Sequence, residues 1–121
     1  MEFDWTQGSL AQGLRLYQAA EFFQAHEAWE SVWLDAQSQD KTFLQALIQV
    51  TAAFHHLQRN NTLGASRLLQ AALRRLESYP ECFAGLPVTM LRQDIHQRLQ
   101  ALEAGAAAIE ITAIRIQPMI R

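Results

Sequence analysis

The chain has 121 residues, of which 50% are hydrophobic and 18% charged, and this is the composition of a globular domain rather than of a disordered or fibrous chain. Ten basic and twelve acidic residues leave a net charge of −2 without a basic run, which argues against a nucleic-acid or membrane-surface partner. Cys82 is the only cysteine, and no apolar run reaches the roughly 18 residues that span a bilayer. We therefore expect a cytoplasmic location.

Apolar residues recur at three- and four-residue spacing in five segments, which predicts an all-α fold. We expect a compact bundle of about five helices in a single domain over residues 1–121, with its core at about 6–104 and an extended C-terminal arm at about 105–121. The predicted helices are, in chain order, about Thr6–Gln18, Glu21–Ala36, Lys41–Arg59, Leu63–Glu77 and Val88–Ala104.

The first two predicted helices differ in the strength of their pattern. The first, at 6–18, is weakened by Gly8 and Gly13, because glycine disfavours helix interiors. The second carries a clear stripe of apolar residues that also includes a histidine. Its members are Phe22, Ala25, His26, Trp29, Trp33 and Ala36. A polar connector follows, and its last residue, Asp40, is the predicted N-cap of the third helix.

The third predicted helix, at 41–59, is apolar over more than half of its circumference, which is typical of a central helix packed by several neighbours. Its polar side chains gather on one strip that contains Gln45, Gln49 and His56. Next comes a tight turn. Asn60 suits the left-handed position that ends a helix, and Asn61 or Thr62 suits the N-cap of the fourth helix.

The last part of the chain breaks the helical pattern twice. Residues 78–87 contain two prolines and a glycine, so we expect a loop before the fifth helix. After that helix, isoleucines alternate with other residues around Ile109, Ile111, Ile114 and Ile116, as in a strand. A single strand has no partner here, so we expect an extended arm lying over apolar surface of this chain or of a second copy.

Three stretches of sequence, in this order, carry a family resemblance. They read YQAAEFFQAHEAWESVW at 17–33, FLQALIQ at 43–49 and, after His56, RNNTLGA at 59–65. The combination resembles the bacterial and archaeal family known as domain of unknown function 309, over about residues 14–76. The resemblance implies a small helical bundle and no assigned activity. The family positions carried over to this chain are His26, Glu27, Glu30, Trp33, Gln49, His56, Asn61 and Gly64.

Three residues depart from the pattern of that family. Gln18 stands where the family has Asn, and Ala20 stands where it has Gly, so both bear on the tight turn between the first two helices. Asn60 stands where the family has Gly. Asn is the residue best suited after Gly to a left-handed backbone, so this departure is benign.

His26 and Glu30 form the centre of the candidate site. Four residues apart, they lie one above the other on a helix. Their neighbours on the helical wheel are apolar, and an ionised carboxylate among aromatic rings is costly without a partner. We therefore expect a buried His–Glu pair, with Glu27 at its edge, facing Gln49 and His56 across the helix interface.

Two readings of these residues stay open. In the favoured one, the chain is a non-catalytic binding or interaction module, and the buried polar cluster fastens its helices. In the alternative, His26, Glu30, Gln49 and His56 form a small-ligand or metal-dependent site, hydrolytic in one version. A divalent metal held by His26, Glu30 and His56 is the least favoured version, because few ligands are in reach.

The predicted turn residues have a structural reading. Asn60 and Asn61 close one helix and cap the next, and Gly64 allows close packing in the first turn of the fourth helix. The isoleucine-rich arm and Trp5 are apolar, and the sequence pattern does not show what covers them. The interface of a homodimer would cover both.

Overall fold

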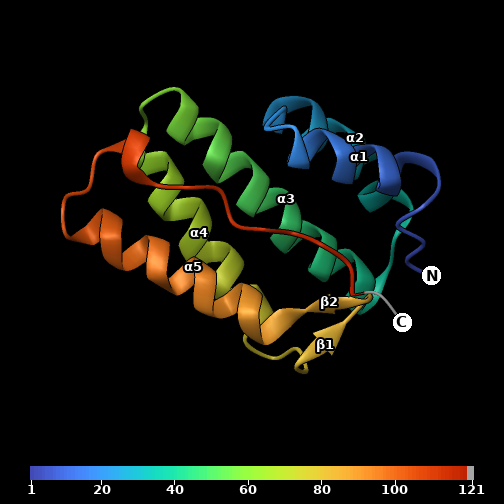
Figure 1. Ribbon diagram of the computed structural model, residues 1–121. Helices are drawn as coiled ribbons and strands as arrows, with labels where there is room; N and C mark the ends of the chain where they lie inside the picture. Colours follow the sequence, from blue (N-terminus) through green and yellow to red (C-terminus); the bar gives the residue numbers. More distant parts are fainter. Residues whose placement is uncertain (120–121) are drawn as a thin grey trace.

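The computed structural model describes residues 1–119 and confirms the predicted all-α bundle (Figure 1). In this range it contains five α-helices, one two-stranded hairpin and a short 3-10 helix. They are, in chain order, α1 (Gly8–Gln18), α2 (Phe22–Asp35), α3 (Ser38–Gln58), α4 (Thr62–Leu76), β1 (Cys82–Phe83), β2 (Leu86–Pro87), α5 (Val88–Glu103) and the 3-10 helix η1 (Ala108–Glu110). No helix within residues 1–119 is long and apolar enough to cross a membrane.

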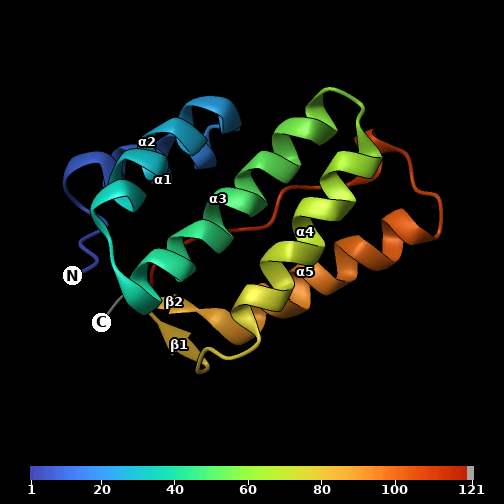
Figure 2. The ribbon, with the colours of Figure 1, turned by 180° about the vertical axis from the view of Figure 1, so that it is seen from behind.

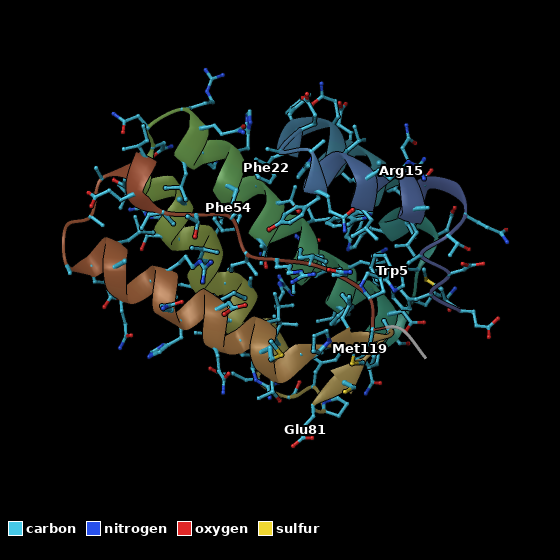
Figure 3. The ribbon with its side chains drawn as sticks, viewed as in Figure 1. Trp5, Arg15, Phe22, Phe54, Glu81 and Met119 are labelled. Atoms are coloured by element: carbon cyan, nitrogen blue, oxygen red, sulfur yellow. The ribbon has the colours of Figure 1, made fainter. Side chains whose placement is uncertain are left out.

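Helix α3 is the centre of the bundle, as its apolar pattern predicts. It packs against α2 on one side and α4 on the other, and η1 also contacts it. Seen from behind, α2, α3 and α4 form one layer, and the C-terminal segment lies on the opposite side (Figure 2). The aromatic core extends across this layer, because Phe22 of α2 and Phe54 of α3 lie with their ring centroids 5.8 Å apart (Figure 3).

Helix α3 begins at Ser38, earlier than the predicted start at Lys41. Its N-cap is Gln37, which makes no side-chain capping bond, so the prediction of Asp40 as N-cap is wrong. Asp40 lies instead in the first turn, where a carboxylate interacts favourably with the positive end of the helix dipole.

Helices α1 and α2 approach so closely that an indole ring lies against a helix backbone. Trp29 is fully buried, and its Nε1 donates a hydrogen bond to the carbonyl oxygen of Leu10 at 3.0 Å. A Cβ atom on Gly13 would come within 2.3 Å of the Trp29 ring. Gly13 therefore has a packing role, because it leaves the space that the indole occupies.

The tight turn between α1 and α2 forms without the glycine of the resembled family. The Ala20 N–H donates to the Tyr17 carbonyl at 2.9 Å, and the Glu21 N–H donates to the Leu16 carbonyl at 2.8 Å. Ala20 adopts φ +61°, a left-handed backbone that is strained for a residue with a Cβ atom. The hydrogen-bonded turn thus holds Ala20 in an unfavourable conformation.

The predicted loop between α4 and α5 contains a short hairpin. Strands β1 and β2 are antiparallel, with Phe83 opposite Leu86. Ala84 and Gly85 connect them with φ values of 54° and 76°. Positive φ at both central residues is the geometry of the hairpin turn that matches strand twist. The pattern did not predict this hairpin, because its strands have two residues each and alanine is not a turn signal.

Trp5 covers the hairpin. Its Nε1 donates a hydrogen bond to the carbonyl oxygen of Ala84 at 2.7 Å, and its ring stacks on Phe3 with centroids 6.0 Å apart. The same ring contacts Trp29 edge-on at 6.3 Å. Trp5, which no sequence pattern placed, therefore joins the N-terminal segment to both the hairpin and the helical core.

Residues 111–119, which we call the arm, run over the surface of their own chain, between α1 on one side and α5 on the other (Figure 1). Ile114 and Ile116 are buried in this chain. The strand-like alternation predicted around Ile109 is wrong, because this residue lies in η1 and is 94% exposed. Since Trp5 and the arm isoleucines are covered within the chain, they no longer argue for a homodimer.

Candidate functional site

His26 and Glu30 lie on the outside of α2. Their closest approach joins His26 Nε2 and Glu30 Oε2 at 3.4 Å, and the side chains are 31% and 52% exposed. The prediction of a buried His–Glu cluster is therefore wrong. An exposed pair of this spacing stabilises a helix by only about 0.3–0.5 kcal/mol.

The buried face of α2 explains this exposure. It consists of Phe22, Ala25 and Trp29, which point at α1 and α3. His26 and Glu30 each follow a buried residue directly, so they are rotated by about 100° from that face. Two of the apolar neighbours that predicted burial, Phe23 and Leu34, are themselves 52% and 66% exposed. Apolar spacing on the wheel thus did not identify the covered face.

Gln49 and His56 form their hydrogen bonds with α4 and with its N-cap. Arg75 Nε of α4 donates a hydrogen bond to Gln49 Oε1 at 3.1 Å. Glu27 is exposed on α2. In residues 1–119, no three His, Cys, Asp or Glu side chains lie where they could hold a metal ion, so His26, Glu30 and His56 do not converge as a ligand set.

A third histidine, His55, belongs to the surface shared by α2 and α3. Its ring lies 5.5 Å from the ring of Phe23 and 6.2 Å from that of His56. The pKa of His55 is lowered, first by partial burial and then by the nearby positive groups of Arg59, His56 and His26.

The turn between α3 and α4 orients the ring of His56. Asn61, the N-cap of α4, accepts a hydrogen bond from the Gly64 N–H with Oδ1 at 2.9 Å. This bond directs the Asn61 Nδ2 toward His56 Nδ1, 3.1 Å away. Because an amide NH₂ only donates, His56 Nδ1 accepts, and the ring carries its proton on Nε2.

Gly64 completes this arrangement. A Cβ atom at Gly64 would come within 2.6 Å of Asn61 Nδ2 and 3.0 Å of Asn61 Cγ. Asn60, with φ +60°, ends α3 in the left-handed conformation. The sequence NNTLG at 60–64 thus forms one unit that ends α3, caps α4 and fixes His56.

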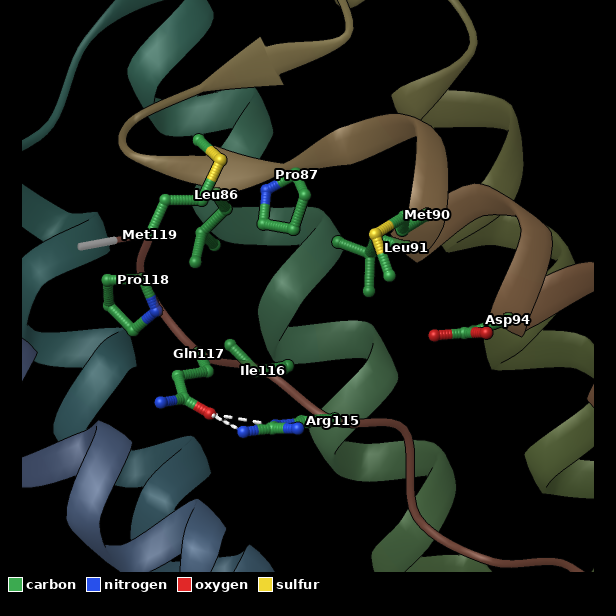
Figure 4. A pocket seen from close by; sticks show the side chains of 10 residues that line it. All are labelled: Leu86, Pro87, Met90, Leu91, Asp94, Arg115, Ile116, Gln117, Pro118 and Met119. Carbon is green, nitrogen blue, oxygen red and sulfur yellow. Dashed lines mark hydrogen bonds between the residues drawn. The ribbon is translucent and has the colours of Figure 1, made fainter. Parts of the chain in front are cut away.

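A second region, between α5 and the arm, contains an apolar groove (Figure 4). Its volume is about 410 Å³. The hairpin and the first turns of α5 form one wall, and the arm forms the other. The lining residues are Leu86, Pro87, Met90, Leu91, Asp94, Arg115, Ile116, Gln117, Pro118 and Met119. Met90 is 60% exposed and Met119 is 44% exposed, so apolar side chains remain open to solvent along the groove.

Two residues at the end of α1 hold the arm that forms this wall. The Tyr17 hydroxyl donates a hydrogen bond to the Ile114 carbonyl oxygen at 2.5 Å. Gln18 Nε2 donates one to the Ile116 carbonyl oxygen at 3.3 Å. Burial raises the pKa of the Tyr17 hydroxyl well above its usual range. At the far end of the arm, the Met119 N–H donates to the carbonyl of Gly85 in the hairpin turn at 2.9 Å.

The pattern of the sequence did not identify the groove. Its walls come from segments far apart in the chain, and neither Met90 nor Met119 belongs to a motif. The only signal was the isoleucine-rich arm, which predicted that apolar surface is covered but not which element lies beside it.

Two comparisons find relatives without an assigned activity. The chain is similar to the conserved hypothetical protein TTHA0068 of Thermus thermophilus, whose crystal structure is 34% identical in sequence, with a TM-score of 0.61; the match covers 84% of this chain and all of that one. It is also 26% identical over 95 residues to the uncharacterised protein YpuF of Bacillus subtilis strain 168. That match covers 74% of this chain, whereas the chain spans only 55% of the length of YpuF.

The family profile named "Domain of unknown function (DUF309)" matches residues 10–68, which run from α1 into α4. This range contains the turn that orients His56 and excludes the groove. Together with the Thermus relative, the match shows that the chain belongs to the domain of unknown function 309 family.

Proposed function

We propose that this chain is a non-catalytic binding module whose ligand site is the groove between α5 and the arm. The observation that supports it is the groove itself: about 410 Å³ of mostly apolar lining with few polar groups. Sites for small molecules and for apolar anchor groups have volumes of about 300–1,000 Å³ and this kind of lining.

The two methionines suit such a site. Met90 and Met119 stand on opposite walls of the groove, one on α5 and one on the arm (Figure 4). Methionine side chains are flexible and polarisable, so they adapt to apolar partners of different shapes. A groove lined in this way favours binding over catalysis, because Asp94 and Arg115 are the only ionisable side chains that line it within residues 1–119.

The three methionines of the chain provide the test, because the third, Met1, does not line the groove. The chain is labelled with ¹³C in its methionine methyl groups and titrated with 1-hexanol, butylbenzene and indole. We expect saturating shifts of the Met90 and Met119 signals and an unchanged Met1 signal.

Two variants complete this experiment. Met90→Asp introduces a charge into the groove and should abolish the shift of Met119. Leu63→Asp is the matched control, because Leu63 is 62% exposed on α4 and does not line the groove. Equal shifts of all three methionines, or no saturating shift with any probe, would contradict the proposal.

For the polar residues, the structure favours the fastening role over a ligand site. Gln49 bonds Arg75 of α4, and His56 bonds the N-cap of α4, so both connect α3 to α4. We expect Gln49→Ala and His56→Ala each to lower stability by about 1 kcal/mol, the usual effect of losing one hydrogen bond. Unchanged urea denaturation midpoints for both variants would count against this role.

We further propose that the chain acts as one domain in the cytoplasm. The support is chemical: its only cysteine, Cys82, is exposed, and a reducing compartment keeps such a thiol free. Localising a tagged full-length protein in cell fractions tests this proposal.

A further inference from the structure

From Ile114 to Gln117 the arm is an extended segment that uses only one of its two main-chain edges. From Ile114 to Gln117, buried and exposed residues alternate, as in a strand. The carbonyls of Ile114 and Ile116 are bonded by side chains of α1. In an extended chain, main-chain groups of neighbouring residues point to opposite sides, so those of Arg115 and Gln117 point away from α1 and toward α5.

This second edge borders the groove, and it is free at Arg115 and Gln117. Arg115 and Gln117 both line the groove, and within residues 1–119 their main-chain N–H and C=O groups make no hydrogen bond. Two residues further along the same edge, the Met119 N–H pairs with the Gly85 carbonyl. The hairpin thus supplies one strand-like bond, and the neighbouring positions Arg115 and Gln117 have no main-chain partner in the described part of the chain.

The hairpin cannot extend this pairing along the groove. Pro87 ends β2, and proline has no N–H to donate. From there α5 satisfies its own backbone and presents side chains to the groove, with Met90 and Leu91 among them. The free edge of the arm therefore faces apolar side chains across a gap.

One charge on the rim is also without a counterion. The Arg115 side chain bonds the Gln117 side chain, and no carboxylate within residues 1–119 forms an ion pair with it. Asp94, whose side chain lines the groove, pairs with Arg98 instead, with Oδ1 of Asp94 3.8 Å from Nη1 of Arg98. An occupant with an acidic group beside Arg115 would complement this charge.

We propose that the groove binds an extended peptide that adds a strand to the free edge of the arm, with an apolar side chain seated between Met90 and Met119 and an acidic side chain beside Arg115. This inference rests on the proposed function, because it names the ligand class of the same groove. Main-chain bonds to Arg115 and Gln117 supply affinity in this mode, and the apolar pocket and Arg115 supply specificity.

The test begins with a phage-displayed library of random peptides selected on the full chain. We expect selected peptides to share an apolar residue with a nearby Asp or Glu. A synthetic peptide of the enriched sequence is then titrated into ¹⁵N-labelled chain. Binding should slow amide hydrogen exchange at Arg115 and Gln117 and leave Ile114, whose main chain faces α1, unchanged.

A matched pair of variants isolates the main-chain bond. Gln117→Pro removes the N–H, whereas Gln117→Ala removes only the side chain. We expect a loss of roughly tenfold in affinity for the first beyond that of the second, which is the effect of about one hydrogen bond. N-methylation of the peptide at its central amides should give the same loss of affinity without changing the protein. It therefore tests the main-chain bond even if Gln117→Pro displaces the arm.

Three results would overturn the inference. The first is a selection that enriches no peptide over the Met90→Asp variant. The second is a peptide that binds Gln117→Pro and Gln117→Ala equally and tolerates N-methylation. The third is a dimer in sedimentation whose interface protects Arg115 and Gln117, since a second copy is then the occupant. In each case, methionine shifts with 1-hexanol would show separately whether the groove binds apolar groups.

Discussion

Gly13→Ala is expected to destabilise the protein although alanine favours helices over glycine. In the interior of an exposed helix, this change stabilises by about 1 kcal/mol. Here the new Cβ atom would lie 2.3 Å from both Cδ1 and Nε1 of Trp29, far inside ordinary contact. The indole ring would have to move, and it is fully buried.

The expected magnitude follows from what that movement disturbs. Overpacking in a core costs about 1–3 kcal/mol. Displacing the ring also breaks the bond from Trp29 Nε1 to the Leu10 carbonyl and leaves a buried donor unsatisfied, at about 1–3 kcal/mol. After the gain in helix propensity, the net loss is about 3 kcal/mol.

Urea denaturation followed by tryptophan fluorescence measures this loss. Gln12→Ala, at an exposed position of the same helix, is the matched control and should stay within about 0.5 kcal/mol of the wild type. In a Trp29→Leu background, which lacks the indole, Gly13→Ala should become neutral or stabilising. Should Gly13→Ala be as stable as the wild type, the close packing of α1 on Trp29 would be refuted.

Four further changes test other parts of the structure. Gly64→Ala should cost about 1 kcal/mol by displacing the capping amide of Asn61, and in an Asn61→Ala background it should cost nothing; equal effects in both backgrounds would contradict the clash. Ala20→Gly should raise stability by roughly 0.5–1 kcal/mol in thermal melts, because φ is +61°, and a loss would show that the turn is not strained. Because burial raises the pKa of Tyr17 in the folded state from 10.0, the stability linked to this group is complete below pH 10.0 and falls as pH rises beyond it. Tyr17→Phe should flatten this alkaline fall, and an identical fall in both proteins would contradict it. Zn²⁺ and Mn²⁺ should change the thermal midpoints of the wild type and of His26→Ala by the same amount. A rise of the midpoint in the wild type alone would indicate a metal site at His26.

The number, order and approximate limits of the helices could be predicted from the sequence. Periodic apolar residues are a local signal, and the breadth of the stripe on α3 is enough to predict a central helix. The turn at Asn60 and Asn61 was equally accessible, because left-handed backbone and N-capping depend on the residues themselves.

Whether His26 and Glu30 are buried or exposed, in contrast, depends on which face of α2 packs against the neighbouring helices. The wheel placed both among apolar residues, but Phe22, Ala25 and Trp29 form the buried face of α2, and the polar pair is rotated outward. Gly13 shows the same limit: in the sequence it is a weak position of a helix, and only the position of Trp29 reveals why glycine stands there.

The groove was decided by tertiary structure alone. The sequence by itself predicted that Ile114 and Ile116 would lie in an extended segment over apolar surface. It did not determine that Tyr17 and Gln18 would hold one edge of that segment while the other edge faces α5. Helical periodicity reports contacts within a few residues, whereas a groove is the space left between segments whose separation depends on the packing of the whole chain.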